Sequence, residues 1–444
     1  MWQIDSAPPN PSHQAKQHLE IHITKVATKY FRSGLYAYGK GIIKDAEDRV
    51  IIDKPIYFML KTNSANLFQS QSFKTYAAIE KIDNLDKNNS FFSYLYRSKV
   101  FLYASNGTVE KITDNGTKLF ELYFIAHEKI NQGLTKNTTK SFLSILPGML
   151  LSSKTNLSKE QKNSFHNTGT AHLLAVSGLH MGIIGFSLEL LLRILGLRKK
   201  FRRIPCLVIA FLYLGIIGSP PSASRAFIML SFYWSACYFN RKPNTFSSLI
   251  NAAVLSLLVN PVQLFDPGFR MSYGVAYYII LLGVPLANKL KSFVSIDKFV
   301  PKDEITASSK LLKKIIYAII DSLAISLAAN MASLPLIFEY FGSISLVGIL
   351  ANIVVIPVAW VTIIAGTLTI LSLLVNIEAI TNMLLFFAGI GAAAIENVLS
   401  GLEKYIPLFW SWDTTACHYG TTIFAIGLLI LPFIRPYFQK IQKS

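Results

Sequence analysis

The chain has 444 residues, of which 52% are hydrophobic and 15% are charged, and its mean hydropathy is +0.40. Soluble proteins are typically about 25% charged, so this composition excludes an ordinary soluble enzyme and a disordered chain. The 43 Lys and Arg outnumber the 25 Asp and Glu, giving a net charge of +18. In a membrane protein such an excess usually reflects basic loops inside the cell, although it is also typical of nucleic-acid binding.

The first part of the chain is polar and predicts a small β-domain. Residues 1–18 form a polar lead-in with three prolines and no apolar segment of a secretory signal. Over residues 19–117, short runs of β-branched and aromatic residues alternate with Gly, Asn and Asp, which predicts about five strands in a small barrel or sandwich. A helical linker and a polar loop are expected over 118–171.

From residue 172 to 434 the apolar runs predict a polytopic α-helical membrane domain of about nine spans. The expected spans are 172–195, 204–217, 222–239, 245–259, 270–287, 315–338, 343–374, 379–400 and 420–434. Several are too short to cross a hydrocarbon core about 30 Å thick, and 343–374 is expected to break at Pro357. Broken or re-entrant helices are tolerated where they are buried in protein or line a water-filled cavity, so they indicate a transport path.

Basic residues predict the topology. They gather in the loop 197–203, at Arg241 and Lys242, in the loop 288–314 and in the tail 435–444, all of which are expected to be cytoplasmic. The β-domain and the loop at Asp266 are then expected outside the membrane. Because no apolar segment precedes residue 172, we expect span 172–195 to act as a reverse anchor, unless the reading frame begins further upstream.

The first motif that carries chemistry is GTAHLLAVSGLHMG, which contains His172, Ser177, Gly178 and His180. Ionisable side chains inside a membrane are costly and suggest a function. The two histidines are eight residues apart, about 80° around a helix, so both are expected to face one cavity. The alternative is that both histidines reach the interface and that Ser177 bonds its own backbone.

The second motif is GSPPSASRA, with Pro221, Ser222 and Arg225. Its Pro-rich break is expected to start a new helix that Ser222 caps. A helix N-terminus and an arginine together favour an anion such as phosphate. The alternative is that Arg225 is buried and paired with an acid from another span, for which the candidates are Glu189, Asp321 and Glu339.

Two further motifs lie later in the chain. Asp266, Gly268 and Arg270 belong to an Asp-Pro-Gly turn that is expected to form a structural corner, with Arg270 a candidate for a cationic path. Asn352 and Pro357 lie within an apolar run, where they predict a kink and a polar contact between helices.

The sequence contains no Gly-rich Lys-Ser/Thr nucleotide loop and no pattern of metal ligands, so we expect no cofactor and no metal. Ser177 with His172 or His180 is the one nucleophile–base candidate, which leaves an intramembrane hydrolase as an unfavoured alternative to a protein without enzymatic activity. A secondary transporter of a small anion is a second alternative, because broken helices and a lone arginine also suffice for it.

In this order, GTAHLLAVSGLHMG, GSPPSASRA, NPVQLFDPGFRMSY and LANIVVIP resemble the ComEC-type competence proteins, inner-membrane channels for DNA uptake in bacterial transformation. The resemblance covers about residues 165–360, and the N-terminal part more weakly resembles the family's extracytoplasmic OB-like domain. Many members carry a C-terminal metallo-β-lactamase-like domain, whose His-x-His-x-Asp-His motif this chain lacks. The family usually has spans before the β-domain, Gln where Arg270 stands and Phe where Tyr273 stands.

The resemblance implies a channel in the bacterial inner membrane that imports single-stranded DNA during natural transformation. Its path is expected to pass the motif residues, with Arg225, Arg270, His172 and His180 tempering phosphate repulsion. The implied partners are the DNA strand, membrane lipids, an outer DNA receptor, a cytoplasmic helicase-like ATPase and a separate nuclease. Self-association into a homo-oligomer is left open.

Overall fold

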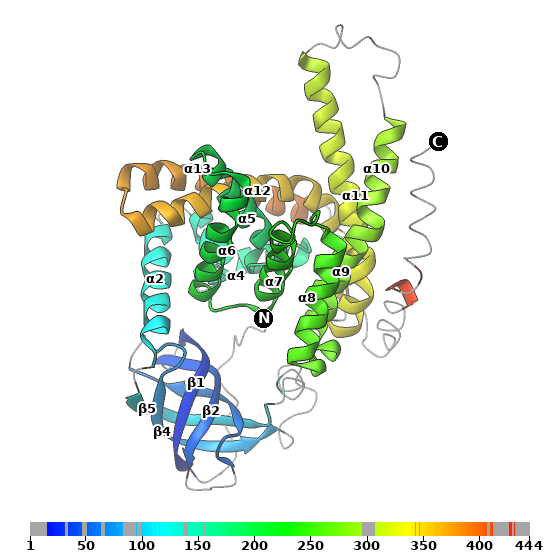
Figure 1. The fold of residues 1–444 in the computed structure, drawn as a ribbon. Coiled ribbons are helices and arrows are strands. Elements are labelled where there is room, and N and C mark those ends of the chain that lie inside the picture. The colour runs from blue at the N-terminus through cyan, green and yellow to red at the C-terminus, as the bar shows by residue number, and fades with distance from the viewer. Residues whose placement is uncertain are drawn as a thin grey trace. The chain divides into compact units, whose positions relative to one another are not determined.

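The computed structural model describes residues 16–31, 34–46, 51–63, 67–82, 95, 100–114, 116–135, 141–154, 156–294, 307–341, 343–345, 347–405, 409–411, 426–428 and 430 (Figure 1). The chain divides into two compact units, Met1–Glu128 and Lys129–Ser444. Most of the expected span 420–434, most of the lead-in 1–18 and all of the tail 435–444 lie outside the described residues.

Five strands of the first unit close into a barrel, which confirms the predicted small β-domain (Figure 1). The strands are β1 (Lys16–Phe31), β2 (Gly34–Ala46), β3 (Pro55–Lys61), β4 (Ser72–Lys81) and β5 (Leu102–Asp114). Their order around the barrel is β1-β2-β3-β5-β4, with β4 pairing back onto β1. The β3–β5 pair is parallel and the others are antiparallel. A five-stranded Greek-key barrel of this kind is the architecture of OB-folds.

The barrel is held by an apolar interior and by close backbone contacts. Phe58 of β3 and Phe73 of β4 are fully buried and meet edge to face, with ring centroids 5.3 Å apart. A Cβ atom on Gly39 of β2 would lie 2.0 Å from the carbonyl oxygen of Lys25, so only glycine lets β1 and β2 approach this closely. Irregular pairing at Glu20/Ile21 and Ile23/Lys25 bends the long β1 strand around the barrel.

Apart from one short strand pair, the regular structure in the rest of the described chain is helical. The α-helices are α2 (Lys118–Thr135), α3 (Ile145–Leu151), α4 (Lys159–Asn167), α5 (Gly178–Ile194), α6 (Lys199–Ile216), α7 (Pro221–Ser235), α8 (Thr245–Val259), α9 (Pro267–Tyr278), α10 (Val284–Phe293), α11 (Ala307–Phe341), α12 (Val347–Val375) and α13 (Glu378–Tyr405). Short 3-10 turns are η3 (Ser141–Ser144), η4 (Ala171–Leu174) and η5 (Pro261–Phe265). A π-helical turn, η6 (Ile279–Gly283), joins α9 to α10, and β6 (Ser343–Ser345) pairs with β7 (Phe409–Ser411).

Four helical segments in the described part of the chain are long and apolar enough to cross a membrane. They are Pro267–Phe293, Leu311–Ile337, Leu350–Val375 and Glu378–Lys404, and Thr245–Val259 is a shorter apolar helix. These segments confirm a membrane protein with an N-terminal β-domain.

Two details of the expected spans were wrong. Helix α12 runs from Val347 to Val375 with Pro357 inside it, so it does not end at the proline as expected. Proline is tolerated within a membrane helix where the backbone group that it frees can be satisfied locally. The basic residues of 197–203 were placed in a loop, yet α6 begins at Lys199, so most of them lie in the first turns of a helix.

Helices of the second unit pack in neighbouring groups (Figure 1). Helices α5, α6 and α7 contact one another, α8 and α9 contact α7, and α9 and α10 contact α11. Helices α12 and α13 run side by side, and α5 also contacts α12. The buried side chains of α3, α5, α6, α12 and α13 form one continuous apolar core.

Candidate functional site

Three of the sequence motifs meet at the start of helix α7. Ser222 Oγ donates a hydrogen bond of 3.0 Å to the carbonyl oxygen of Val176, which precedes α5. One turn further, Arg225 Nη2 donates a bond of 2.8 Å to the carbonyl oxygen of Gly268 in the Asp-Pro-Gly turn. The first turn of α7 therefore connects the segment before α5 to the segment that starts α9. We call Val176, Ser222, Arg225 and Gly268 the α7 junction.

The segment around the two histidines is not one continuous helix, so the helical spacing from which a shared cavity was predicted does not apply. His172 is exposed on η4, Ala175 and Ser177 have extended backbones, and α5 starts at Gly178. His180 is fully buried on α5. The 80° estimate assumed an uninterrupted helix, and the break between η4 and α5 removes its basis. Gly178 brings α5 close to α7, since a Cβ on it would lie 3.5 Å from Cβ of Ala226.

Ser177 and His180 are brought together as a local capping arrangement. Ser177 is the N-cap of α5, and its backbone N–H donates to Nδ1 of His180 over 3.3 Å. Oγ of Ser177 lies 2.9 Å from the same nitrogen. This contact satisfies the N-terminus of a buried helix. In the described residues no carboxylate hydrogen-bonds to His180, so the pair lacks the third group that orients the base of a hydrolase.

Arg225 is 7% exposed, and its Nε is buried without a hydrogen-bond partner among the described residues. Two of the three acids proposed as its partners bind other cations, because Glu189 pairs with Arg202 and Asp321 pairs with Lys291. The side chain of Glu339 lies outside the described residues. The expectation that Ser222 caps α7 was also wrong.

The N-cap of α7 is Pro220, and Pro221 occupies the first helical position, where its missing N–H costs nothing. Ser222 is therefore already inside the helix. Its hydroxyl reaches across to another segment instead of back to its own backbone.

The Asp-Pro-Gly turn starts α9, as its turn chemistry predicts. Asp266 Oδ1 accepts a hydrogen bond of 2.8 Å from the backbone N–H of Gly268. A Cβ on Gly268 would lie 3.3 Å from Asp266 Oδ1 and 3.7 Å from Arg225 Nη2, so Asp266 and Arg225 flank this glycine. The side chain of Arg270 lies back against the same turn. Its Nε donates a hydrogen bond of 2.9 Å to the carbonyl oxygen of Leu264. Its Cζ lies 5.8 Å from the centre of the Phe265 ring.

Asn352 and Pro357 lie on α12, and within the described residues neither makes a hydrogen bond to the α7 junction. Asn352 Nδ2 donates to Ser326 Oγ of α11 over 3.3 Å, while its buried Oδ1 has no partner among the described residues. Asn330 Nδ2 bonds the Ser326 carbonyl over 2.8 Å. Ser326 and Asn330 were missed in the sequence, although polar residues four apart in an apolar helix mark one helix face.

The described residues contain no group of three His, Cys, Asp or Glu side chains that could hold a metal ion. An open cleft of about 220 Å³ lies between α4 and α13, where Gln161 Nε2 donates a hydrogen bond of 2.9 Å to Glu396 Oε1. Glu160 and Glu403 also line it, so this second site is acidic and unsuited to a polyanion.

Comparison with known proteins places these features in a family. A family model described as Competence protein matches residues 149–436. The ComE operon protein 3 of Bacillus subtilis (strain 168) is 25% identical over 198 residues, which is 45% of this chain and 22% of that protein. The aligned region is thus about a fifth of that relative's length. No solved structure matches the chain.

Proposed function

This chain belongs to the competence protein family, and we propose that it takes part in DNA uptake as a transmembrane channel for single-stranded DNA. The family model matches from the last residues of α3 through α13, a range that includes the α7 junction and the four long apolar helical segments. The protein acts, in this proposal, by binding and guiding the strand, without covalent chemistry.

The observation that carries the proposal is the assembly of three motif segments around Arg225. A phosphate backbone needs a cationic route through the low dielectric of a membrane. Arg225 is fixed by one charged hydrogen bond to Gly268, and its Nε keeps an unused donor. We propose that the strand passes beside this junction and that exposed His172, on the neighbouring η4, contacts it.

The barrel carries a second set of residues that suits a single strand. His18 of β1 and Tyr76 of β4 are paired across the strands, exposed, and 4.8 Å apart between ring centroids. Exposed Lys16, Lys74 and Lys111 occupy the outward positions of the neighbouring strands. Aromatic rings beside lysines are the combination that stacks bases and tracks phosphates, so we propose that the β-domain receives the strand.

We further propose about nine membrane crossings, with the basic segments in the cytoplasm and the barrel outside, in the bacterial inner membrane. The energy would then come from a cytoplasmic helicase-like ATPase. An outer receptor would deliver DNA, and a separate nuclease would remove the second strand. Self-association would be compatible with this arrangement.

The test is uptake of labelled DNA into the cytoplasm of the host, compared with DNA bound at the surface. A gene deletion and Arg225→Gln are expected to lose internalised DNA while surface-bound DNA is unchanged. Arg193→Gln removes the same charge from an exposed position on α5 and is the matched control. Membrane abundance of each variant is measured alongside, so that loss of protein is not mistaken for loss of transport.

Normal uptake in the deletion strain would refute the channel. Loss in the deletion but normal uptake in Arg225→Gln would remove Arg225 from the path. A small-anion transporter would instead show loss of anion flux in Arg225→Gln, measured in vesicles that contain the purified protein.

A further inference from the structure

Helices α5 and α7 pack against each other at two close contacts. Near their starts, a Cβ atom on Gly178 of α5 would lie 3.5 Å from Cβ of Ala226 of α7. Further along, a Cβ atom on Gly185 would lie 3.0 Å from Cδ2 of Leu230 and 3.3 Å from Cη2 of Trp234. Because the contacts follow the same order on both helices, α5 and α7 run in the same direction. The second contact has little spare room, so the position of α7 along α5 is well defined.

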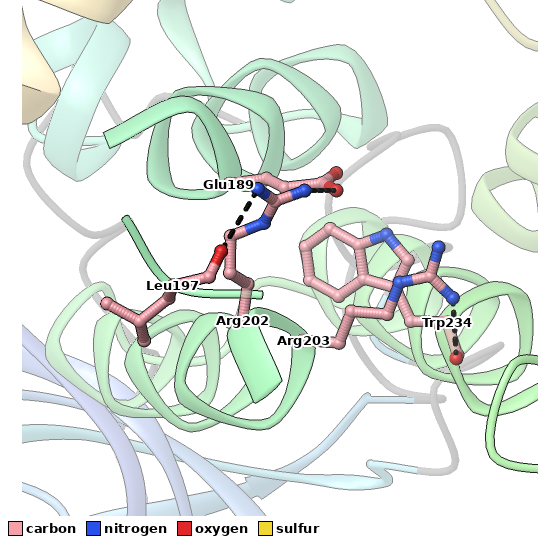
Figure 2. Close-up of polar contacts among 5 residues, drawn as sticks. All are labelled: Glu189, Leu197, Arg202, Arg203 and Trp234. Carbon is pink, nitrogen blue, oxygen red and sulfur yellow. Dashed lines mark hydrogen bonds and ion pairs between the residues drawn. The ribbon is translucent and has the colours of Figure 1, made fainter. Parts of the chain in front are cut away.

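The far end of α7 is held by a buried arginine of α6. Arg203 is 4% exposed, and its Nη1 donates a long hydrogen bond of 3.4 Å to the carbonyl oxygen of Trp234, the next-to-last residue of α7 (Figure 2). The last carbonyl groups of a helix carry a partial negative charge, which favours a cation beside them. Arg203 therefore joins α6 to the C-terminal end of α7.

The preceding residue joins α6 to α5. Arg202 Nη2 lies 3.6 Å from Oε1 of Glu189 (Figure 2). Glu189 follows Gly185 by four residues, about one helical turn, so the ion pair lies next to the contact that α5 makes with α7. Two adjacent arginines of one helix thus hold the two helices that pack on each other. We call Glu189, Arg202, Arg203 and Trp234 the α6 clamp.

The α6 clamp is an expensive way to hold helices together. The Nε atoms of Arg202 and Arg203 are both buried without a hydrogen-bond partner among the described residues. A guanidinium has five N–H donors, and burying it with few partners is unfavourable, whereas apolar side chains of similar size would join the helices without that cost. Directional contacts fix the position of a helix more sharply than apolar ones do, which is the property that the two arginines add.

The same helix α7 carries the α7 junction at its other end. Arg225 donates to the Gly268 carbonyl there, and Ser222 donates to the Val176 carbonyl. Trp234 follows Arg225 by nine residues, about 14 Å along a helix that rises about 1.5 Å per residue. Because the backbone bonds of a helix make it move as one body, a shift of α7 at Trp234 also moves Arg225.

We propose that the α6 clamp sets the position of α7 along α5 and thereby positions Arg225. Arg202 and Arg203 are then positioning residues for DNA uptake. The inference rests on the proposed function for its effect on uptake, while the position of α7 itself is measurable without DNA.

The first experiment measures that position by cross-linking in membranes that contain the full-length chain. Gly178→Cys and Ala226→Cys form the reporter pair, because their Cβ separation of 3.5 Å lies within the range of about 3.5–4.5 Å found in disulfides. Bridging under a mild oxidant is timed by the loss of free thiols. The native cysteines are first replaced by alanine; they are Cys206, Cys237 and Cys417.

The reporter pair is expected to bridge rapidly in the parent chain. Arg203→Gln is expected to slow bridging about tenfold, the factor that corresponds to one hydrogen bond from a charged group. Arg203→Lys keeps a cation at the end of α7 and is expected to restore most of the rate. A second pair, Gly283→Cys with Ala328→Cys, would have Cβ atoms 3.1 Å apart in η6 and α11 and reports general loosening. Its bridging rate is expected to stay unchanged in Arg203→Gln.

A further variant tests the position of α7 without removing a charge. Gly185→Ala crowds Leu230 and Trp234 and is expected to slow the reporter pair as well. Gly182→Ala is the matched control on the same helix, because no atom lies within 4 Å of its added Cβ. It is expected to leave the bridging rate unchanged.

Uptake of labelled DNA is then compared at equal membrane abundance. Arg203→Gln is expected to lower internalised DNA about tenfold, Arg203→Lys to restore most of it, and Arg193→Gln, at an exposed position on α5, to leave it unchanged. Unchanged bridging of the reporter pair in Arg203→Gln would overturn the α6 clamp, even if Arg225→Gln loses uptake as proposed. Equal slowing of both cysteine pairs would overturn it too, because the arginine would then act on stability alone. Slower bridging of the reporter pair with normal uptake would overturn the link between the clamp and uptake.

Discussion

The contact between α12 and α13 at Gly391 leaves no room for a side chain. A Cβ atom there would lie 2.1 Å from Oγ1 of Thr362 and 3.1 Å from its Cβ, whereas ordinary contact begins at 3.4 Å. Thr362 is 1% exposed and its Oγ1 bonds the Val358 carbonyl over 2.9 Å, so it has no free space to turn into. Small residues allow membrane helices to approach in this way. We predict that Gly391→Ala destabilises the helical unit.

The size of the effect follows from two opposing terms. Overpacking a close contact costs about 1–3 kcal/mol, and Ala in place of Gly in a helix returns about 1 kcal/mol. The expected net loss is therefore up to about 2 kcal/mol. Gly401 lies on the same helix with no atom within 4 Å of its added Cβ, so Gly401→Ala keeps the helix gain alone and is expected to stabilise.

The assay is unfolding of the purified chain in one detergent, by heat or by titration with a denaturing detergent. Thr362→Ala removes Oγ1 and is expected to restore most of the stability that Gly391→Ala loses, which a double-mutant cycle measures as positive coupling. The reasoning would be refuted if Gly391→Ala were as stable as Gly401→Ala. It would fail equally if Thr362→Ala gave no rescue.

Three other predictions test the barrel and one buried contact. Burial raises the pKa of Glu80, which lies opposite Tyr103, above its ordinary 4.5, so the folded barrel binds this proton more tightly than the unfolded chain. Its stability should fall as pH rises from 4.5 through the raised pKa, and Glu80→Gln should remove that fall and unfold at a higher temperature in neutral buffer. Tyr213 donates to the Leu150 carbonyl inside the apolar core, so Tyr213→Phe should cost about 1–3 kcal/mol in the same unfolding assay. Phe58→Ala in the barrel core should cost about 3–5 kcal/mol, whereas Phe101→Ala, at a position 44% exposed, should cost far less.

The sequence predicted strands and helices correctly where a single local pattern is enough to specify them. Alternation of β-branched and aromatic residues predicted about five strands, and the barrel has β1 to β5. The apolar run 245–259 coincides with α8, because an uninterrupted run bounded by Asn244 and Asn260 has clear end signals. The Asp-Pro-Gly turn likewise marked the start of α9.

Local patterns misled where a neighbouring segment supplied the deciding contact. Ser222 is a good N-cap by type, but Pro220 takes that position and the Ser222 hydroxyl bonds Val176 instead. Pro357 is a helix breaker by type, but α12 continues through it. Propensity describes a residue in its own segment, and packing against other segments outweighs it.

The sequence by itself determined that the chain enters a membrane, carries a small β-domain and holds the motifs of its family, since these follow from composition and from residues close together in the chain. Only the tertiary structure decided which of those motifs meet. Arg225 and Gly268 are 43 residues apart, and Ser222 and Val176 are 46 apart. Such contacts depend on how whole helices pack, which no local pattern encodes. The same packing buries Arg203, whose Nε has no hydrogen-bond partner among the described residues, and its basic sequence neighbours gave no sign of that burial.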